Sequence, residues 1–120
     1  MTNVIVGKQW RVAVYGTLRN GCVNHPYLAD AKYLGTVELQ GWKMHSNGSF
    51  PYITKSEGSI IAEIYEIDEA SLGGIDDLDG YPDHYTRKQV ITDFGECWLY
   101  YVDKLPWGCF KIPSGDWLKQ

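Results

Sequence analysis

Hydrophobic and polar residues alternate along much of this 120-residue chain with the two-residue period of β-strands. The period is clearest over Ser59–Ile67, where both faces carry isoleucine. Tyr33–Met44 alternates more loosely, and glycines interrupt it at Gly35 and Gly41. Glycine inside a strand is typical of a bulge or of a close backbone contact, so we expect this strand to bend sharply.

A second kind of strand is predicted at Arg11–Tyr15, which is almost continuously apolar from Val12 onward. Gly16 ends it, and Thr17-Leu18-Arg19 follow without a polar spacer. A buried strand that runs into a tight turn leaves several backbone N–H groups free to bind an anion. The local pattern alone favours a simpler interpretation, in which Gly16 only permits a turn with positive φ.

Two short helices are predicted. Asn24 is a suitable N-cap for a helix over Pro26–Ala31, since proline is tolerated in a first turn. Asp68-Glu69-Ala70-Ser71 opens a second helix, which is expected to end at Gly80 with Pro82 just beyond it.

The remaining segments complete the predicted fold. Glu57-Gly58 predicts a turn, and Tyr85–Phe94 and Glu96–Val102 predict a hairpin around Phe94-Gly95. Val4-Ile5-Val6 either pairs at a sheet edge or frays. The whole chain, 1–120, is expected to be one small α+β domain with a mostly antiparallel sheet that is closed or strongly curved.

Composition narrows the classes of function. The net charge of -4 argues against nucleic-acid binding, which requires a basic face. Nine tyrosines and five tryptophans suit either a cavity with a polar rim or the packing of strands.

The three cysteines, an odd number at wide spacing, indicate reduced thiols rather than a disulfide framework. No metal site is expected, because His25, His45 and His84 show no zinc-like spacing to cysteine. The sequence shows neither a signal peptide nor an apolar run long enough to cross a membrane. A cytoplasmic protein that does not bind membranes is therefore expected.

An acidic group stands at the predicted end of the second helix: Asp76, Asp77 and Asp79. The helix dipole disfavours negative charge there. A carboxylate held against aromatic side chains has a raised pKa and is a useful base, which makes Asp79, beside Tyr81, a candidate. The alternative, about equally favoured by the spacing, is that these carboxylates only bind backbone groups or solvent.

Tyr85 and Arg87 follow at strand spacing and share a face. They are expected to border the same pocket or to brace the acidic residues. An ion pair between Arg87 and Asp76 is the equally favoured structural alternative.

Eight motifs together resemble the γ-glutamylcyclotransferase-like superfamily, in its γ-glutamylamine cyclotransferase and avirulence-induced-gene-like branch. In chain order they are Val14-Tyr15-Gly16-Thr17-Leu18-Arg19, Asn24-His25, Tyr33-Leu34-Gly35, Pro51-Tyr52, Glu63-Ile64-Tyr65, Ile75-Asp76-Asp77-Leu78-Asp79-Gly80-Tyr81-Pro82, Tyr85-Thr86-Arg87 and Ser114-Gly115-Asp116-Trp117. Each is weak alone, but the ordered set, from about residue 11 to 117, is specific.

The resemblance implies a small mixed β-barrel with two short flanking helices. It also implies a reaction without cofactor or metal, in which the α-amine of a small γ-glutamyl substrate attacks its own γ-carbonyl and releases 5-oxoproline and an amine. Donors that hold the substrate map onto Tyr15, Gly16, Thr17 and Leu18, and a pocket tyrosine maps onto Tyr85. The catalytic carboxylate maps onto Asp79.

The chain departs from the family pattern at that carboxylate. The family has glutamate in a Leu-Asp-x-x-Glu-Gly pattern, whereas Asp79 is one methylene shorter, with a reach reduced by ~1.5 Å. An active cyclotransferase is the first hypothesis. The alternatives are a pocket that binds a γ-glutamyl-like carboxylate without turnover, and an interaction protein that uses its aromatic surface. The sequence identifies neither the leaving amine nor the oligomeric state.

Overall fold

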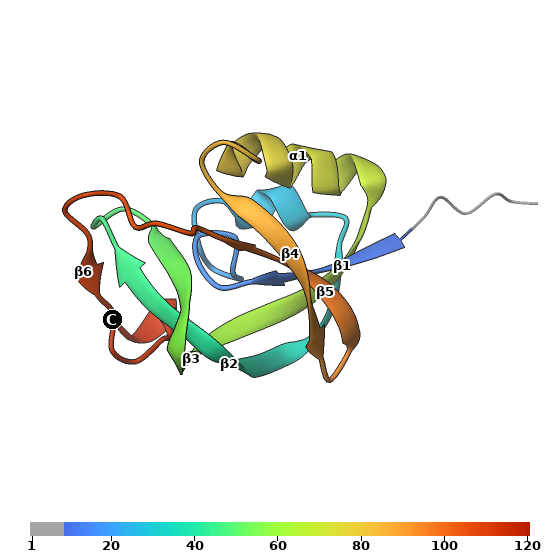
Figure 1. The fold of residues 1–120 in the computed structure, drawn as a ribbon. Coiled ribbons are helices and arrows are strands. Elements are labelled where there is room, and N and C mark those ends of the chain that lie inside the picture. Colours follow the sequence, from blue (N-terminus) through green and yellow to red (C-terminus); the bar gives the residue numbers. More distant parts are fainter. Residues whose placement is uncertain (1–8) are drawn as a thin grey trace, which may run out of the picture.

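The computed structural model describes residues 9–120, which form one curved six-stranded sheet with a helix packed against it (Figure 1). Its elements are β1 (Gln9–Val14), η1 (His25–Leu28), β2 (Lys32–Ser46), β3 (Pro51–Asp68), α1 (Glu69–Asp79), β4 (Thr86–Thr92), β5 (Gly95–Tyr101), β6 (Phe110–Lys111) and η2 (Trp117–Lys119). The possible edge strand at Val4-Ile5-Val6 lies outside the described residues.

The strand order is β4-β5-β1-β3-β2-β6, in which β1 and β5 are parallel and all other neighbours are antiparallel. The sheet curls into a half-barrel whose edges are β4 and β6 (Figure 1). The predicted α+β fold with a mixed, mostly antiparallel, strongly curved sheet is confirmed. The curvature stops short of full closure.

The second half of the central strand β1, Val12–Val14, is buried on both faces, as its apolar sequence predicts. Val12 and Val14 belong to the hydrophobic cluster that includes Leu72 and Ile75 of α1. Ala13 points the other way, into a second cluster inside the curl of the half-barrel. A strand covered on both sides is held rigidly, so the turn that follows it is fixed in place.

The long strands β2 and β3 correct one prediction. No turn occurs at Glu57-Gly58, because β3 continues through it. The ladder absorbs the extra residues at a bulge, where the partner changes from Ser59 opposite Gln40 to Lys55 opposite Trp42. Such a bulge increases the local bend of the strand pair.

Both glycines predicted to mark irregularities in β2 do so. The register shifts at Gly41, where φ is +92°, and again just before Gly35. Gly35 also allows a close contact, since a Cβ there would lie 2.5 Å from the ring of Phe94.

Helix α1 begins and ends as predicted. The Asp68 side chain accepts a hydrogen bond from the Ser71 N–H, which caps the first turn. Gly80 ends the helix with φ at +65° in the left-handed region. The helix therefore stops immediately after Asp79.

Two other boundaries differ from the prediction. The first helix is a single 3₁₀ turn, His25–Leu28, rather than Pro26–Ala31. Asn24 does not cap it with its side chain, which instead donates to Thr17 Oγ1 at 2.9 Å. The hairpin turn is Asp93-Phe94, one residue earlier than expected, because Thr92 pairs with Gly95.

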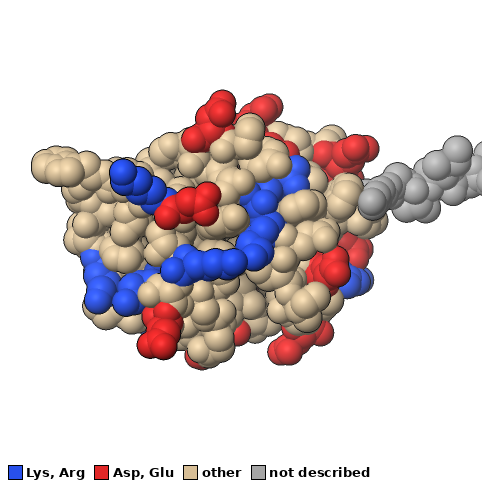
Figure 2. Space-filling model, viewed as in Figure 1, with Lys and Arg blue, Asp and Glu red and all other residues tan. Residues whose placement is uncertain are grey.

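The charged side chains are not evenly spread. Lysines and arginines form a row across the face that carries β4, with acidic side chains toward its margins (Figure 2). Lys55 lowers the pKa of Lys88, because two nearby ammonium groups repel each other. Within residues 9–120, no helix has both the length and the apolar character needed to cross a membrane.

Candidate active site

A cavity of about 180 Å³ opens between the end of β1, the end of α1 and the segment that precedes β4. It is lined by Ala13, Val14, Tyr15, Gly16, Thr17, Leu18, Asn24, Phe50, Pro51, Leu78, Asp79, His84, Tyr85 and Tyr100. All six predicted site residues are in this lining. Residues about sixty positions apart in the chain are thus brought to one small space.

The loop after β1 contributes backbone groups to the cavity wall. The carbonyls of Gly16 and Thr17 accept hydrogen bonds from the N–H groups of Arg19 and Asn24, both at 2.9 Å. The N–H groups of Gly16, Thr17 and Leu18 donate to no acceptor within residues 9–120. Unused donors that are adjacent in sequence form a site suited to a carboxylate.

Gly16 has a different role from the simpler one considered for it. Its φ is not positive, so the turn does not require glycine for that reason. A Cβ on Gly16 would instead lie 2.5 Å from Cγ of Pro51. Glycine is needed here because the start of β3 packs directly on the loop.

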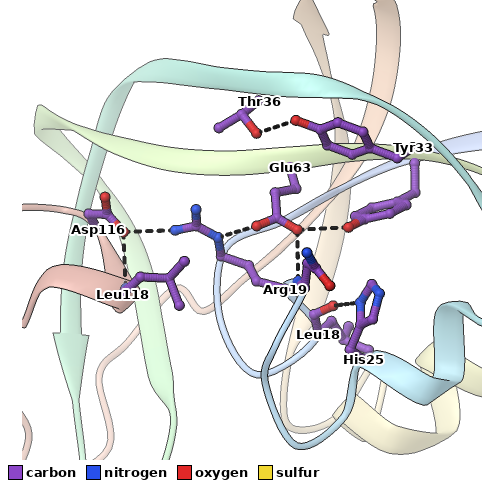
Figure 3. Close-up of polar contacts among 10 residues, drawn as sticks. Leu18, Arg19, His25, Tyr33, Thr36, Glu63, Asp116 and Leu118 are labelled. Atoms are coloured by element: carbon purple, nitrogen blue, oxygen red, sulfur yellow. Dashed lines mark hydrogen bonds and ion pairs between the residues drawn. The ribbon is translucent and has the colours of Figure 1, made fainter.

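A buried ion-pair network anchors the far end of this loop (Figure 3). Arg19 Nε donates to Glu63 Oε2 and Arg19 Nη1 donates to Asp116 Oδ1, both at 2.8 Å. Glu63 also accepts from the Asn20 N–H at 2.9 Å and from the Tyr65 hydroxyl at 2.8 Å. Since every partner is buried or fixed by backbone, Arg19 holds the loop against both β3 and the chain's last residues.

Arg19 and Glu63 both keep their charges in this network. Burial opposes ionisation of Glu63, but hydrogen bonds from the Asn20 N–H, Arg19 and Tyr65 outweigh it and lower the pKa of Glu63. Arg19 has a raised pKa, because bonds to Glu63 and Asp116 outweigh its burial. Both partners therefore remain charged throughout the physiological range.

Asp79 is the cavity's carboxylate. It is half-buried, and burial together with the nearby charge of Asp76 raises its pKa to about 7. Its backbone carbonyl accepts a hydrogen bond from the Tyr85 N–H at 3.2 Å, which ties the helix end to the next cavity segment. A carboxyl group with this pKa exchanges a proton readily near neutral pH.

The two neighbouring carboxylates, Asp76 and Asp77, do not line the cavity. Asp76 accepts from Arg87 Nε at 2.8 Å and from Nη2 at 3.1 Å, so the ion pair considered as an alternative is present. The Tyr100 hydroxyl donates to the same carboxylate. Asp77 is exposed. Only Asp79 of these three faces the cavity.

Tyrosines line the rest of the cavity and are fixed by hydrogen bonds. The Tyr85 hydroxyl donates to the Pro51 carbonyl at 2.7 Å, and its ring stacks on Tyr52 at 5.0 Å between centroids. The Tyr15 hydroxyl donates to the Tyr100 carbonyl at 2.8 Å. Burial raises the pKa of Tyr15, Tyr85 and Tyr100, so these hydroxyls stay protonated.

Several residues of the cavity and its surroundings were not predicted from the sequence. His84 lines the cavity beside Asp79, and its Nε2 lies 3.0 Å from the Tyr52 hydroxyl. Because His84 lies between Asp79 and Tyr85 in the sequence, it could have been predicted as a cavity residue. Glu63 was also recognisable, as one of two carboxylates in the apolar run Ile60–Ile67. Nothing in the sequence pairs it with Arg19 and Asp116.

Comparison with known proteins agrees with this architecture. The profile of the family described as "Gamma-glutamyl cyclotransferase, AIG2-like" matches residues 12–119. The γ-glutamylcyclotransferase family protein YtfP of Escherichia coli K12 is 32% identical over 108 residues, which are 90% of this chain and 96% of YtfP. MJ1514 of Methanocaldococcus jannaschii, named as a candidate γ-glutamylcyclotransferase, is 41% identical over 116 residues, covering 88% of this chain and 93% of its own.

A solved structure has a similar fold. The crystal structure of the uncharacterized protein PH0828 from Pyrococcus horikoshii superimposes with a TM-score of 0.81 at 35% identity, covering 90% of this chain and 89% of PH0828. The sequence match spans the loop, the helix end and the strands that build the cavity. This chain therefore belongs to the AIG2-like γ-glutamyl cyclotransferase family.

Proposed function

We propose that this protein is a γ-glutamylcyclotransferase that uses Asp79 as its acid and base. One observation carries the proposal: a carboxyl group with a pKa of about 7 shares a small cavity with the loop Gly16-Thr17-Leu18, whose three backbone N–H groups meet no acceptor in residues 9–120. A substrate with both an α-carboxylate and an α-ammonium group matches this pair of features.

The reaction divides between the two sides of the cavity. The N–H groups of Gly16, Thr17 and Leu18 hold the α-carboxylate, and Tyr15 and Tyr85 form the wall against the glutamyl chain. Asp79, deprotonated, takes a proton from the α-ammonium group. The freed amine attacks the γ-carbonyl carbon and a ring C–N bond forms. The original amide C–N bond then breaks as Asp79 returns the proton to the leaving amine. The ring nitrogen gives its remaining extra proton to that amine, which departs as an ammonium ion.

The physical gain is one of proximity. The nucleophile and the electrophile belong to the same molecule, so the protein has only to hold the chain folded on itself. The cavity of about 180 Å³ is smaller than typical pockets for drug-sized ligands. It suits the γ-glutamyl part, with the leaving amine directed to the mouth near Phe50 and His84.

The test is production of 5-oxoproline. The purified protein is incubated with γ-glutamyl amines and γ-glutamyl dipeptides, and 5-oxoproline is measured by mass spectrometry. We expect product from at least one class, and a loss on the order of 100-fold or more in Asp79→Asn. Asp77→Asn removes the same charge from the exposed side of the same helical turn, so it should retain full activity.

Absence of product from every substrate, or equal product from Asp79→Asn, would contradict the proposal. The short Asp79 side chain then favours the second hypothesis, a pocket that binds without turnover. Calorimetry with glutamate and 5-oxoproline separates the two, because binding without product supports that second function alone.

A further inference from the structure

Asp76 lies about one helical turn before Asp79, and hydrogen bonds from other elements fix its carboxylate. Three donors converge on its carboxylate: Nε and Nη2 of Arg87 and the hydroxyl of Tyr100. Bidentate guanidinium–carboxylate pairs have a fixed geometry. Tyr100 is itself part of the cavity lining, so the bracing reaches the site.

Arg87 is held as tightly as the carboxylate that it binds. Its guanidinium carbon lies 4.3 Å from the ring centroid of Tyr81 and 4.1 Å from that of Trp98. Aromatic faces on a guanidinium attract it electrostatically and restrict its motion. The arginine and its carboxylate therefore form a rigid unit that joins α1 to β4 and β5.

The rigid unit acts on Asp79 through charge. Residues three apart on a helix are neighbours, so Asp76 and Asp79 lie on the same side of α1. Repulsion between them favours the protonated form of Asp79, and the cation of Arg87 limits this repulsion by partly neutralising Asp76. The charge of Asp76 is the second cause, after burial, of the raised pKa of Asp79.

The other titratable groups that face Asp79 are few. From the remaining elements of the cavity wall they are Tyr15, His84, Tyr85 and Tyr100. The three tyrosines have raised pKa values and stay neutral, so they do not titrate where Asp79 does. Among the described residues, Asp76 is the charged neighbour that raises the pKa of Asp79.

We propose that Asp76, fixed by Arg87 and Tyr100, is a positioning residue that sets the pH at which Asp79 gains and loses its proton. Asp76 touches no substrate in this scheme. It acts through Asp79, and the inference that this matters for turnover rests on the proposed cyclotransferase function. The proton affinity of Asp79 itself is measurable without any turnover.

The test follows the ¹³Cγ resonance of Asp79 by NMR titration in four proteins. Asp76→Asn keeps the acceptor for Tyr100 and removes the charge, so the midpoint of Asp79 should fall by roughly one pH unit. Arg87→Gln exposes Asp79 to the full charge of Asp76, so its midpoint should rise. Asp77→Asn, the matched control, should titrate as the wild type does.

Opposite shifts distinguish this role from simple bracing, because loss of bracing would move both variants the same way. Thermal denaturation of each variant verifies that it is folded at the titration temperature. A midpoint in Asp76→Asn no different from that in Asp77→Asn overturns the proposal. So do shifts of Asp76→Asn and Arg87→Gln in the same direction.

The pH dependence of 5-oxoproline formation connects the result to function. The acidic limb of kcat/KM should move with the NMR midpoint in each variant, whereas a merely structural role would lower the rate equally at all pH values. If the wild type makes no 5-oxoproline, the proposed function fails while the titrations still decide the role of Asp76.

Discussion

Gly16 and Pro51 lie so close that a Cβ on the glycine would be 2.5 Å from the Cγ of the proline. Pro51 begins β3 and its carbonyl accepts the hydroxyl of Tyr85, so the contact joins two walls of the cavity. Real Cβ atoms do not approach a neighbour to 2.5 Å. The loop after β1 can therefore lie against the start of β3 only because residue 16 is glycine.

Gly16→Ala should push the loop away from Pro51. Overpacking of this kind costs about 1–3 kcal/mol in the free energy of unfolding. Because the displaced residues carry the unused N–H groups, 5-oxoproline formation should fall much further than stability does. Urea denaturation and a product assay measure the two effects.

Gly73→Ala is the matched control. Gly73 lies within α1, and a Cβ there meets nothing within 4 Å. Alanine in a helix is favoured over glycine, so this variant should gain up to about 1 kcal/mol and keep its activity. An active Gly16→Ala variant would show that the contact does not position the loop.

The raised pKa of Asp79 predicts a cost to stability. Its folded pKa of about 7 exceeds the unfolded value of 3.8, so the folded state binds the proton more tightly. Stability is thus highest below pH 4 as far as this group is concerned, and falls as the pH rises to about 7. The loss at higher pH is at most about 4 kcal/mol.

Asp79→Asn removes this cost. We expect its melting temperature to exceed that of the wild type at pH 8 and to approach it at pH 4, in scans at matched ionic strength. Asp77→Asn, an exposed carboxylate, should show no such pH-dependent difference. Equal stability of wild type and Asp79→Asn at pH 8 would mean that Asp79 ionises without penalty.

Much of this fold was predictable because local signals and tertiary structure agree. Val12–Val14 is apolar on both faces and becomes the doubly covered centre of the sheet, and Gly80 ends α1 in the left-handed conformation that glycine favours. The turn predicted at Glu57-Gly58 is absent because that prediction used only neighbouring residues. The bulge at Gly41 depends instead on how β2 pairs with β3. The incomplete closure of the sheet likewise depends on how all six strands pair, which no local pattern specifies.

The candidate site was predictable where the motif residues touch it directly, as with Asp79 and the loop after β1. The network of Arg19, Glu63 and Asp116 was not, because its members lie on three distant segments. The sequence does not indicate which carboxylates will pair with Arg19. They meet because the loop after β1 and the segment before Asp116 both bind β3.

Arg19→Met should destabilise the protein strongly. It leaves Glu63 and Asp116 buried without their cation, and breaking a buried pair in this way costs about 3–5 kcal/mol. The loop it anchors should also loosen and lower the affinity for 5-oxoproline. Chemical denaturation and calorimetry test the two consequences.

The comparison is Arg11→Met, which removes an arginine from a pair with Glu66 at 3.7 Å whose side chains are 43% and 31% exposed. Exposed pairs contribute little, so this variant should lose no more than about 1 kcal/mol. Similar losses in the two variants would argue that the buried network has no special role.

Asp79→Glu tests whether the shorter carboxylate limits catalysis. The family pattern has glutamate at this position, and the additional methylene restores ~1.5 Å of reach toward the α-amine. Since a displacement of ~1 Å can cost on the order of 100-fold, we expect kcat/KM for γ-glutamyl substrates to rise by about 10-fold or more. Steady-state 5-oxoproline assays at pH 8, where the carboxylate is ionised, measure this directly. A glutamate variant as inactive as Asp79→Asn would show instead that this cavity is built around aspartate.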